Sequence, residues 1–171
     1  MTWEEQLQNR SIGNIAACNQ KFCLTPYMEE LIKRTHSQAL QKQFIPSTLT
    51  FKAQFSNDYL REEEFMPVQN LIHRYRTKVI ITVTNQCACY CQFCTRQRIT
   101  RSGDINFDNL EQIVQYISQH PEIEDVLITG GDPLILSTSK LCFILQKISE
   151  INSVKIIRIG TRIPITLPQR I

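Results

Sequence analysis

The chain has 171 residues, of which 42% are hydrophobic and 20% are charged, and its formal net charge is +3. A chain of this size can bury its own core, and the small charge does not indicate a nucleic-acid partner, because phosphate binding needs a concentrated basic face. No stretch approaches the roughly 20 apolar residues that cross a bilayer, and the N-terminus MTWEEQLQNR lacks the pattern of a signal peptide. We therefore expect a cytoplasmic protein with no membrane or nucleic-acid partner.

Residues 1–75 predict a helical N-terminal extension followed by a connector. Thr2 and Glu5 have the spacing of a capping box, and Thr25 before Pro26 predicts the start of a second short helix. Residues 43–67 show no sustained hydrophobic period. We interpret them as an extended, charged connector.

Residues 76–171 predict an α/β core of about three parallel strand-helix units. The expected strands cover residues 79–84, 124–129 and 154–165, and the expected helices cover 108–120 and 139–151. This alternation is typical of βα units, whose functional loops lie at the carboxyl ends of the parallel strands. Because a closed barrel takes about eight units, we expect a truncated, incomplete barrel whose third strand is an apolar edge.

Four of the seven cysteines fall in one loop, NQCACYCQFCTRQRIT, directly after the first predicted strand. Cys87, Cys91 and Cys94 form a C-x3-C-x2-C pattern, and Cys89 lies outside it. Three thiolates suit a [4Fe-4S] cluster with one iron open to a substrate or cofactor. Cys89 as a fourth ligand would need a very tight loop, and zinc is a lesser alternative because no histidine has a matching spacing.

The remaining cysteines, Cys18, Cys23 and Cys142, are scattered along the chain. The odd total of seven cysteines and the scattered positions of these three do not fit a secreted disulfide framework. We predict that all three are packing residues.

The order of the motifs resembles a known superfamily. A C-x3-C-x2-C loop with Phe93 before its last cysteine, followed by a Gly-Gly-acid turn after the second strand, is similar to the radical S-adenosylmethionine superfamily. More narrowly, HRYRTKVIITVTNQCACYCQFCTRQR, TGGDPL and RIGTRIPITLPQRI resemble the lysine 2,3-aminomutase family. The resemblance runs through nearly the whole chain.

The resemblance implies a cluster and an S-adenosylmethionine site. Cys87, Cys91 and Cys94 would ligate the cluster, and reductive cleavage of S-adenosylmethionine would give methionine and a 5′-deoxyadenosyl radical. The glycines of the turn would permit close backbone approach, and its aspartate would accept from the methionyl ammonium. This assigns cofactor binding to Gly130, Gly131 and Asp132; the alternative is a plain strand-ending turn.

The resemblance also implies an amino-acid substrate bound through pyridoxal phosphate, on which an amino group moves from the α to the β carbon. Arg96 matches the arginine that meets the substrate carboxylate. Arg74 matches a contact to pyridoxal phosphate, and Lys78 stands where the family commonly has a second arginine. The alternative is a solvated basic stretch. Lysine is the first choice of substrate, ahead of glutamate and a lysine destined for an elongation factor.

The family's lysine that binds pyridoxal phosphate covalently belongs to its second half. We therefore expect this chain to be inactive alone in the aminomutase reaction, or to be completed by a separately encoded C-terminal half or a homo-oligomer. A reductant such as flavodoxin or ferredoxin would supply the electron. Two alternatives stay open: a noncatalytic remnant and an electron-transfer iron-sulfur protein.

Overall fold

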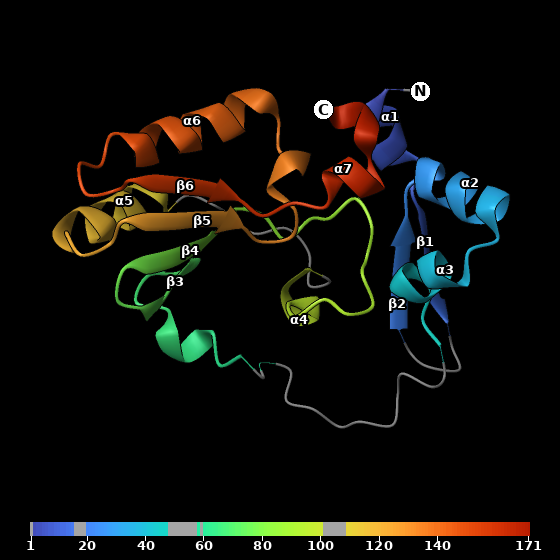
Figure 1. Cartoon of the computed structure of the whole chain (residues 1–171), viewed down its shortest axis with the longest axis horizontal. Coiled ribbons are helices and arrows are strands. Elements are labelled where there is room, and N and C mark those ends of the chain that lie inside the picture. The colour runs from blue at the N-terminus through green and yellow to red at the C-terminus, as the bar shows by residue number, and fades with distance from the viewer. Residues whose placement is uncertain (1, 16–19, 48–57, 59, 101–108) are drawn as a thin grey trace.

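The computed structural model describes residues 2–15, 20–47, 58, 60–100 and 109–171 (Figure 1). Most of the predicted connector, and Cys18, lie outside the described residues. The helices are α1 (Trp3–Gln8), α2 (Pro26–Thr35), α3 (Gln38–Phe44), α4 (Gln97–Thr100), α5 (Leu110–Gln119), α6 (Thr138–Ser149) and α7 (Ile163–Thr166). The strands are β1 (Ser11–Ile15), β2 (Gln20–Leu24), β3 (Leu71–Tyr75), β4 (Lys78–Thr82), β5 (Asp125–Thr129) and β6 (Ile156–Ile159). Short 3-10 turns cover Glu63–Phe65, Pro133–Ile135 and Pro168–Arg170.

The N-terminal extension contains the two predicted helix starts and a hairpin that the sequence did not predict. Thr2 and Glu5 form the capping box of α1, and the Thr25 hydroxyl accepts from the first turn of α2. Between these helices, β1 and β2 pair in an antiparallel hairpin. A β-carbon on Gly13 would overlap the Phe22 ring on the neighbouring strand. Gly13 and Phe22 therefore pack closely across the hairpin, in a cross-strand contact that a search for alternating polarity does not detect.

The predicted parallel core is confirmed, with one additional strand. The four-stranded sheet has the order β3-β4-β5-β6; β4, β5 and β6 are parallel, and β3 is antiparallel to β4. The third predicted strand is too long, because β6 ends at Ile159 and residues 163–166 form α7. Pro164 lies in the first turn of that helix, where its missing N–H costs nothing.

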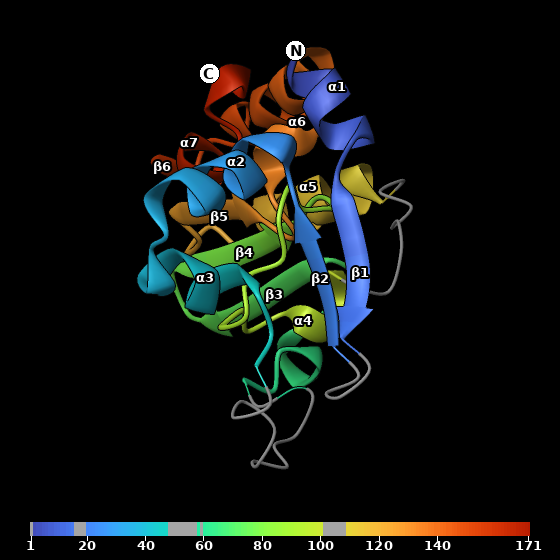
Figure 2. The same cartoon turned by 90° about the vertical axis from the view of Figure 1, so that its right-hand side faces the viewer.

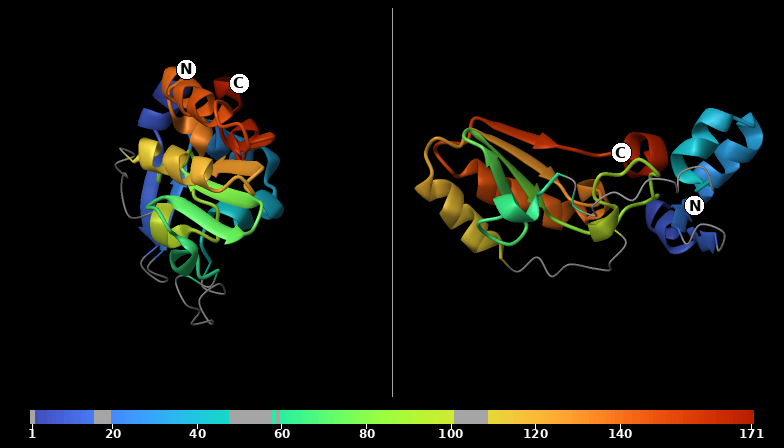
Figure 3. Two further views of the ribbon diagram at one scale, coloured as in Figure 1. Left: turned by 90° about the vertical axis from the view of Figure 1, so that its left-hand side faces the viewer. Right: turned by 90° about the horizontal axis from the view of Figure 1, so that it is seen from below.

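Helices α5 and α6 pack on one face of the sheet (Figure 3). The two predicted amphipathic helices bury their isoleucines against the side chains of β4 and β5 that point to this face. The core there includes Val79, Ile81, Ile113, Ile117, Val126, Ile128, Ile144 and Ile148. Cys142 on α6 is exposed rather than packed, so that prediction was wrong; Cys23 is fully buried, as predicted. The α6 position of Cys142 lies beside the buried stripe but outside it.

Among the described strands, β6 forms one edge of the sheet and pairs with β5 alone. Ile156 and Ile159 are 47% and 38% exposed, which confirms the predicted apolar edge. The N-terminal extension lies beyond the carboxyl ends of the parallel strands (Figures 1 and 2). None of the helices in the described ranges has the length and apolar character to span a bilayer.

Candidate functional site

Three loops converge at the carboxyl ends of β4, β5 and β6, as the sequence predicted. They are the cysteine loop (residues 85–96), the glycine turn (residues 130–132) and the third loop (residues 160–162), and together they line a cavity of about 330 Å³, called here the first cavity. Each loop follows a parallel strand of one sheet. The sheet therefore gathers at the carboxyl ends of its parallel strands three motifs that lie between residues 85 and 162 of the sequence.

The cysteines of the C-x3-C-x2-C pattern line the first cavity and are partly buried. No three His, Cys, Asp or Glu side chains in the described ranges lie close enough together to hold a single metal ion. A four-iron cluster spaces its thiolates around a cube and does not need such a tight group. Cysteine thiolates are the usual ligands of iron-sulfur clusters, so the donor set of Cys87, Cys91 and Cys94 fits such a cluster.

Cys89 is turned toward the N-terminal extension. Its side chain is 4% exposed, and its Sγ accepts a hydrogen bond of 3.4 Å from the backbone N of Thr25. It packs in a small apolar cluster with residues of β2, α2 and α3. Burial raises its pKa to about 12. Cys89 is therefore a buried neutral thiol that attaches the loop to the extension.

Burial also raises the pKa of two of the cysteines in the pattern. For Cys87, desolvation is reinforced by the negative charge of Asp132, which raises the pKa further. For Cys91, desolvation raises the pKa, and the nearby Arg162 guanidinium partly offsets the rise. At these positions burial favours the neutral thiol over the thiolate, and a bound cation such as iron would favour the thiolate.

Asp132 joins the glycine turn to the third loop. Its Oδ1 accepts from Thr161 Oγ1 at 2.6 Å and from Leu134 N at 3.1 Å, and its Oδ2 accepts from Arg162 N at 2.7 Å. The residue is 6% exposed, and burial raises its pKa although these hydrogen bonds lower it. Its carboxylate lines the cavity, but both of its oxygens accept hydrogen bonds from the chain itself. In this structure Asp132 therefore holds the loops of the cavity together.

The two glycines of the turn allow the cysteine loop to approach closely. A β-carbon on Gly130 would overlap the Thr84 carbonyl oxygen, and one on Gly131 would overlap the Gln86 carbonyl oxygen. Gly130 also has a φ of 132°, which favours glycine. Gly131 N donates to Thr84 O at 2.5 Å, and Asp132 N donates to Gln86 O at 2.8 Å. The close approach expected of these glycines is thus made, in this structure, by the protein's own backbone.

The N-terminal extension closes the other side of the cysteine loop, which sequence reasoning missed. Arg10 Nη1 donates to the Cys87 carbonyl at 2.6 Å. Tyr90 N donates to Cys23 O at 2.9 Å. Sequence motifs do not predict contacts to backbone carbonyls, because every residue has one. The extension is therefore part of the framework of the site.

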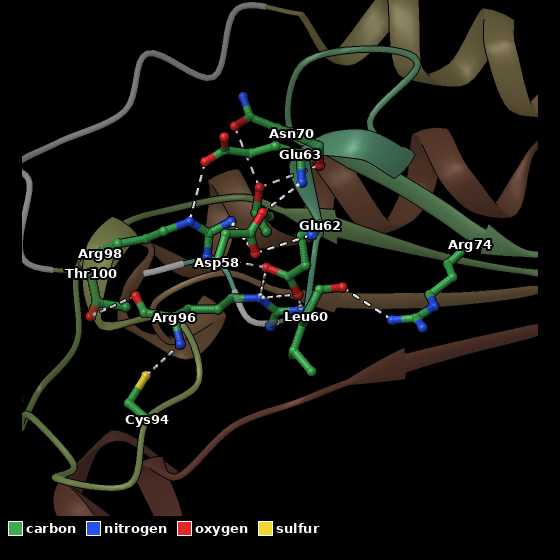
Figure 4. A network of polar contacts seen from close by, with 11 residues as sticks. Asp58, Leu60, Glu62, Glu63, Asn70, Arg74, Cys94, Arg96, Arg98 and Thr100 are labelled. Atoms are coloured by element: carbon green, nitrogen blue, oxygen red, sulfur yellow. Dashed lines mark hydrogen bonds and ion pairs between the residues drawn. The ribbon is translucent and has the colours of Figure 1, made fainter. Parts of the chain in front are cut away.

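Arg96 lines the first cavity and is held by Glu62 (Figure 4). Its Nε and Nη2 donate to the two oxygens of the Glu62 carboxylate at 2.7–3.2 Å, and the side chains are only 14% and 6% exposed. Arg98 adds ion pairs to Glu62 and Asp58, at 3.6 Å and 3.1 Å. The Nε–Nη2 edge of the Arg96 guanidinium is therefore occupied by the Glu62 carboxylate. Its Nη1 has no hydrogen bond to a residue in the described part of the chain.

Arg74 and Lys78 line a different, second cavity of about 360 Å³ on the sheet face away from α5 and α6. Arg74 Nη1 donates to Leu60 O at 3.1 Å. Lys78 Nζ lies 3.6 Å from Asp125 Oδ2, and Arg158 Nη2 lies 2.6 Å from the same oxygen. The structure brings Arg74 and Lys78 together, adds Arg158, and separates all three from the cysteines. Glu62 lines the second cavity and Arg96 the first, so this pair lies between them.

Residues 81–169, about half of the chain, match the radical SAM superfamily. The cysteine loop, the glycine turn and the third loop all lie inside the matched range. The chain belongs to this superfamily.

Within it, the chain is similar to curated aminomutases. It is 39% identical over 156 residues to L-lysine 2,3-aminomutase of Fusobacterium nucleatum, covering 88% of this chain and 37% of that protein. It is 36% identical over 164 residues to L-lysine 2,3-aminomutase of Clostridium subterminale, covering 92% and 39%. A glutamate 2,3-aminomutase of Clostridioides difficile is 40% identical over 116 residues, covering 67% and 28%. The chain spans less than half the length of these relatives.

Proposed function

We propose that this chain forms the cluster-binding and S-adenosylmethionine-binding part of a radical aminomutase that acts on an amino acid, with lysine as first choice. The observation that carries this proposal is the first cavity, in which the three cysteines of the pattern and the glycine turn meet within a radical SAM chain. Cys87, Cys91 and Cys94 hold the [4Fe-4S] cluster, and the glycine turn borders S-adenosylmethionine. When bound, these groups supply a radical that removes a hydrogen atom from the substrate.

The chain's own residues bind and orient the reactants in this proposal. Arg96 binds the substrate carboxylate through the guanidinium edge that Glu62 leaves open, since the two edges of a guanidinium can each hold a carboxylate. Arg74 and Lys78 bind the phosphate of pyridoxal phosphate in the second cavity. Lys78 offers a point charge rather than a fork, so its contact to phosphate is weaker than that of an arginine.

The complete reaction requires more strand-helix units than the three described here. No strand in the described part of the chain pairs with the outer side of β6, which exposes Ile156 and Ile159, as an edge strand does when another strand belongs beside it. We propose a separately encoded C-terminal half, or a second copy of the chain, as the completing partner. A reductant such as flavodoxin or ferredoxin supplies the electron. Turnover of lysine to β-lysine by reconstituted chain alone contradicts the need for a partner.

Anaerobic reconstitution tests the proposal. We expect the chain to bind about four irons, to show an electron paramagnetic resonance signal when reduced, and to change that signal when S-adenosylmethionine is added. Cys94→Ser should lose the cluster, whereas Cys142→Ser, at an exposed position on α6, should keep it. A cluster indifferent to S-adenosylmethionine favours the electron-transfer alternative, and no cluster in the parent chain favours the noncatalytic remnant.

A further inference from the structure

Among the described residues, Arg162 is the only one whose charged side chain donates a hydrogen bond to a sulfur of the C-x3-C-x2-C cysteines. Its Nη1 donates to Cys91 Sγ at 2.7 Å. Cys94 Sγ accepts from a backbone N–H, that of Arg96 at 3.3 Å. Arg162 lies in the stretch RIGTRIPITLPQRI, and the sequence predicts no role for this arginine.

Several contacts fix the Arg162 side chain in this position. Its guanidinium carbon lies 5.1 Å from the centre of the Phe44 ring and 5.0 Å from the centre of the Phe93 ring. Its Nη2 donates to Gln43 Oε1 at 2.8 Å. A guanidinium next to aromatic rings is favoured electrostatically and loses little freedom when it then donates a hydrogen bond. The charge is therefore directed at the sulfur by contacts with two segments of the chain, α3 and the cysteine loop.

The backbone of Arg162 is held as firmly. Its N–H donates to Asp132 Oδ2 at 2.7 Å, and the Asp132 Oδ1 accepts from Thr161. The glycine turn therefore fixes the third loop, and the third loop brings the arginine to the cysteine loop. All three loops of the first cavity participate in one chain of contacts.

We infer that Arg162 is a positioning residue for the iron-sulfur cluster: it holds the Cys91 sulfur in place and stabilises the reduced cluster through a charged hydrogen bond to that sulfur. Reduction adds one negative charge to the cluster, and a cation that donates to a ligand sulfur lowers the free energy of the reduced form more than that of the oxidised form. Hydrogen bonds to the sulfurs and local charge are established determinants of cluster potentials. This inference rests on the proposed function, because it needs a cluster at the cysteines.

The test is a redox titration of the reconstituted chain, followed by electron paramagnetic resonance. In Arg162→Gln, which removes the charge, we expect the ratio of reduced to oxidised cluster at a fixed potential to fall about tenfold, a shift of about 59 mV for one electron. Arg162→Lys, which keeps the charge, should lie between Gln and the parent. Arg34→Gln removes the same charge from an exposed position on α2 and should leave the potential unchanged.

A second variant addresses the geometry. Phe93 is 61% exposed, so Phe93→Leu removes one ring beside the guanidinium with little effect on folding. We expect a potential shift of the same sign as that of Arg162→Gln, but smaller. Equal potentials in the parent and Arg162→Gln, with equal iron content, overturn the inference while leaving the proposed function intact. Failure of the parent chain to bind a cluster contradicts the proposed function itself.

Discussion

The two cavities of this chain differ in how completely they are built. The first is lined by three loops and backed by the N-terminal extension, and its side chains contact one another across the site. The second lies against one face of the sheet, and its basic residues come from β3, β4 and β6, with Asp125 as the partner of two of them. Under the proposed function, this difference means that the chain supplies the framework for the cluster and only one wall of the site for the anionic cofactor.

The link between the cavities is the Glu62–Arg96 pair, and Glu62→Ala should produce the largest loss of stability. It leaves the buried guanidinium of Arg96 without its partner and removes one ion pair of Arg98. Removing one partner of a buried pair costs about 3–5 kcal/mol. Urea unfolding of the apo chain measures this. Glu64→Ala, at an exposed pair with Arg61, is the control and should change the free energy of unfolding by less than about 1 kcal/mol.

The close contact between the glycine turn and the cysteine loop predicts that two glycine substitutions at the first cavity differ strongly in effect. Gly131→Ala introduces a β-carbon into the backbone of the cysteine loop, so we expect a loss of about 2–3 kcal/mol and a lower iron content after reconstitution. Gly160→Ala is the matched control, because its β-carbon would meet Thr129 Oγ1 at an acceptable 3.4 Å. Equal iron content in the two variants would contradict the close fit of the turn and the loop.

Asp132→Asn tests how the glycine turn holds the third loop. An amide nitrogen cannot accept from Arg162 N, so we expect a loss of about 1–2 kcal/mol near neutral pH. The variant should also change the pH dependence. Because burial raises the pKa of Asp132, the folded chain binds this proton more tightly than the unfolded chain. This aspartate therefore makes the free energy of unfolding fall as the pH rises from the ordinary aspartate pKa through the raised value.

Urea titrations across that pH range measure the effect. The parent chain should show the additional decline, and Asp132→Asn should lack it. Identical pH profiles of the two chains would mean that the pKa of Asp132 is not higher in the folded chain than in the unfolded chain.

The second cavity predicts the smallest effect. Lys78→Arg introduces a fork beside Arg74, and we expect it to tighten binding of pyridoxine 5′-phosphate by up to about tenfold, equivalent to about 1.4 kcal/mol. This probe lacks the aldehyde that reacts with lysines, so equilibrium dialysis reports the phosphate contact alone. Lys140→Arg, on the exposed start of α6, is the control. Equal affinities for Lys78→Arg and the parent would place the phosphate elsewhere.

Local sequence rules determined the helix starts and the loop order of this protein. The caps at Thr2 and Thr25, the helices α5 and α6 and the three parallel strands follow from capping chemistry and hydrophobic period, which act within a few residues. The spacing of the cysteines likewise indicates cluster chemistry without any knowledge of the fold. The roles of the site residues taken from the resemblance remain predictions.

Only the tertiary structure decided what those loops contact. The hairpin β1–β2, the antiparallel strand β3 and the ends of β6 depend on partners distant in sequence, and such partners leave no local pattern. Three contacts of the site also join residues distant in sequence. They are the ion pair between Glu62 and Arg96 and the hydrogen bonds from Thr25 to Cys89 and from Arg162 to Cys91. Four cysteines in one short loop are thus distinguished by their surroundings, because burial and long-range hydrogen bonds exist only once the chain has folded.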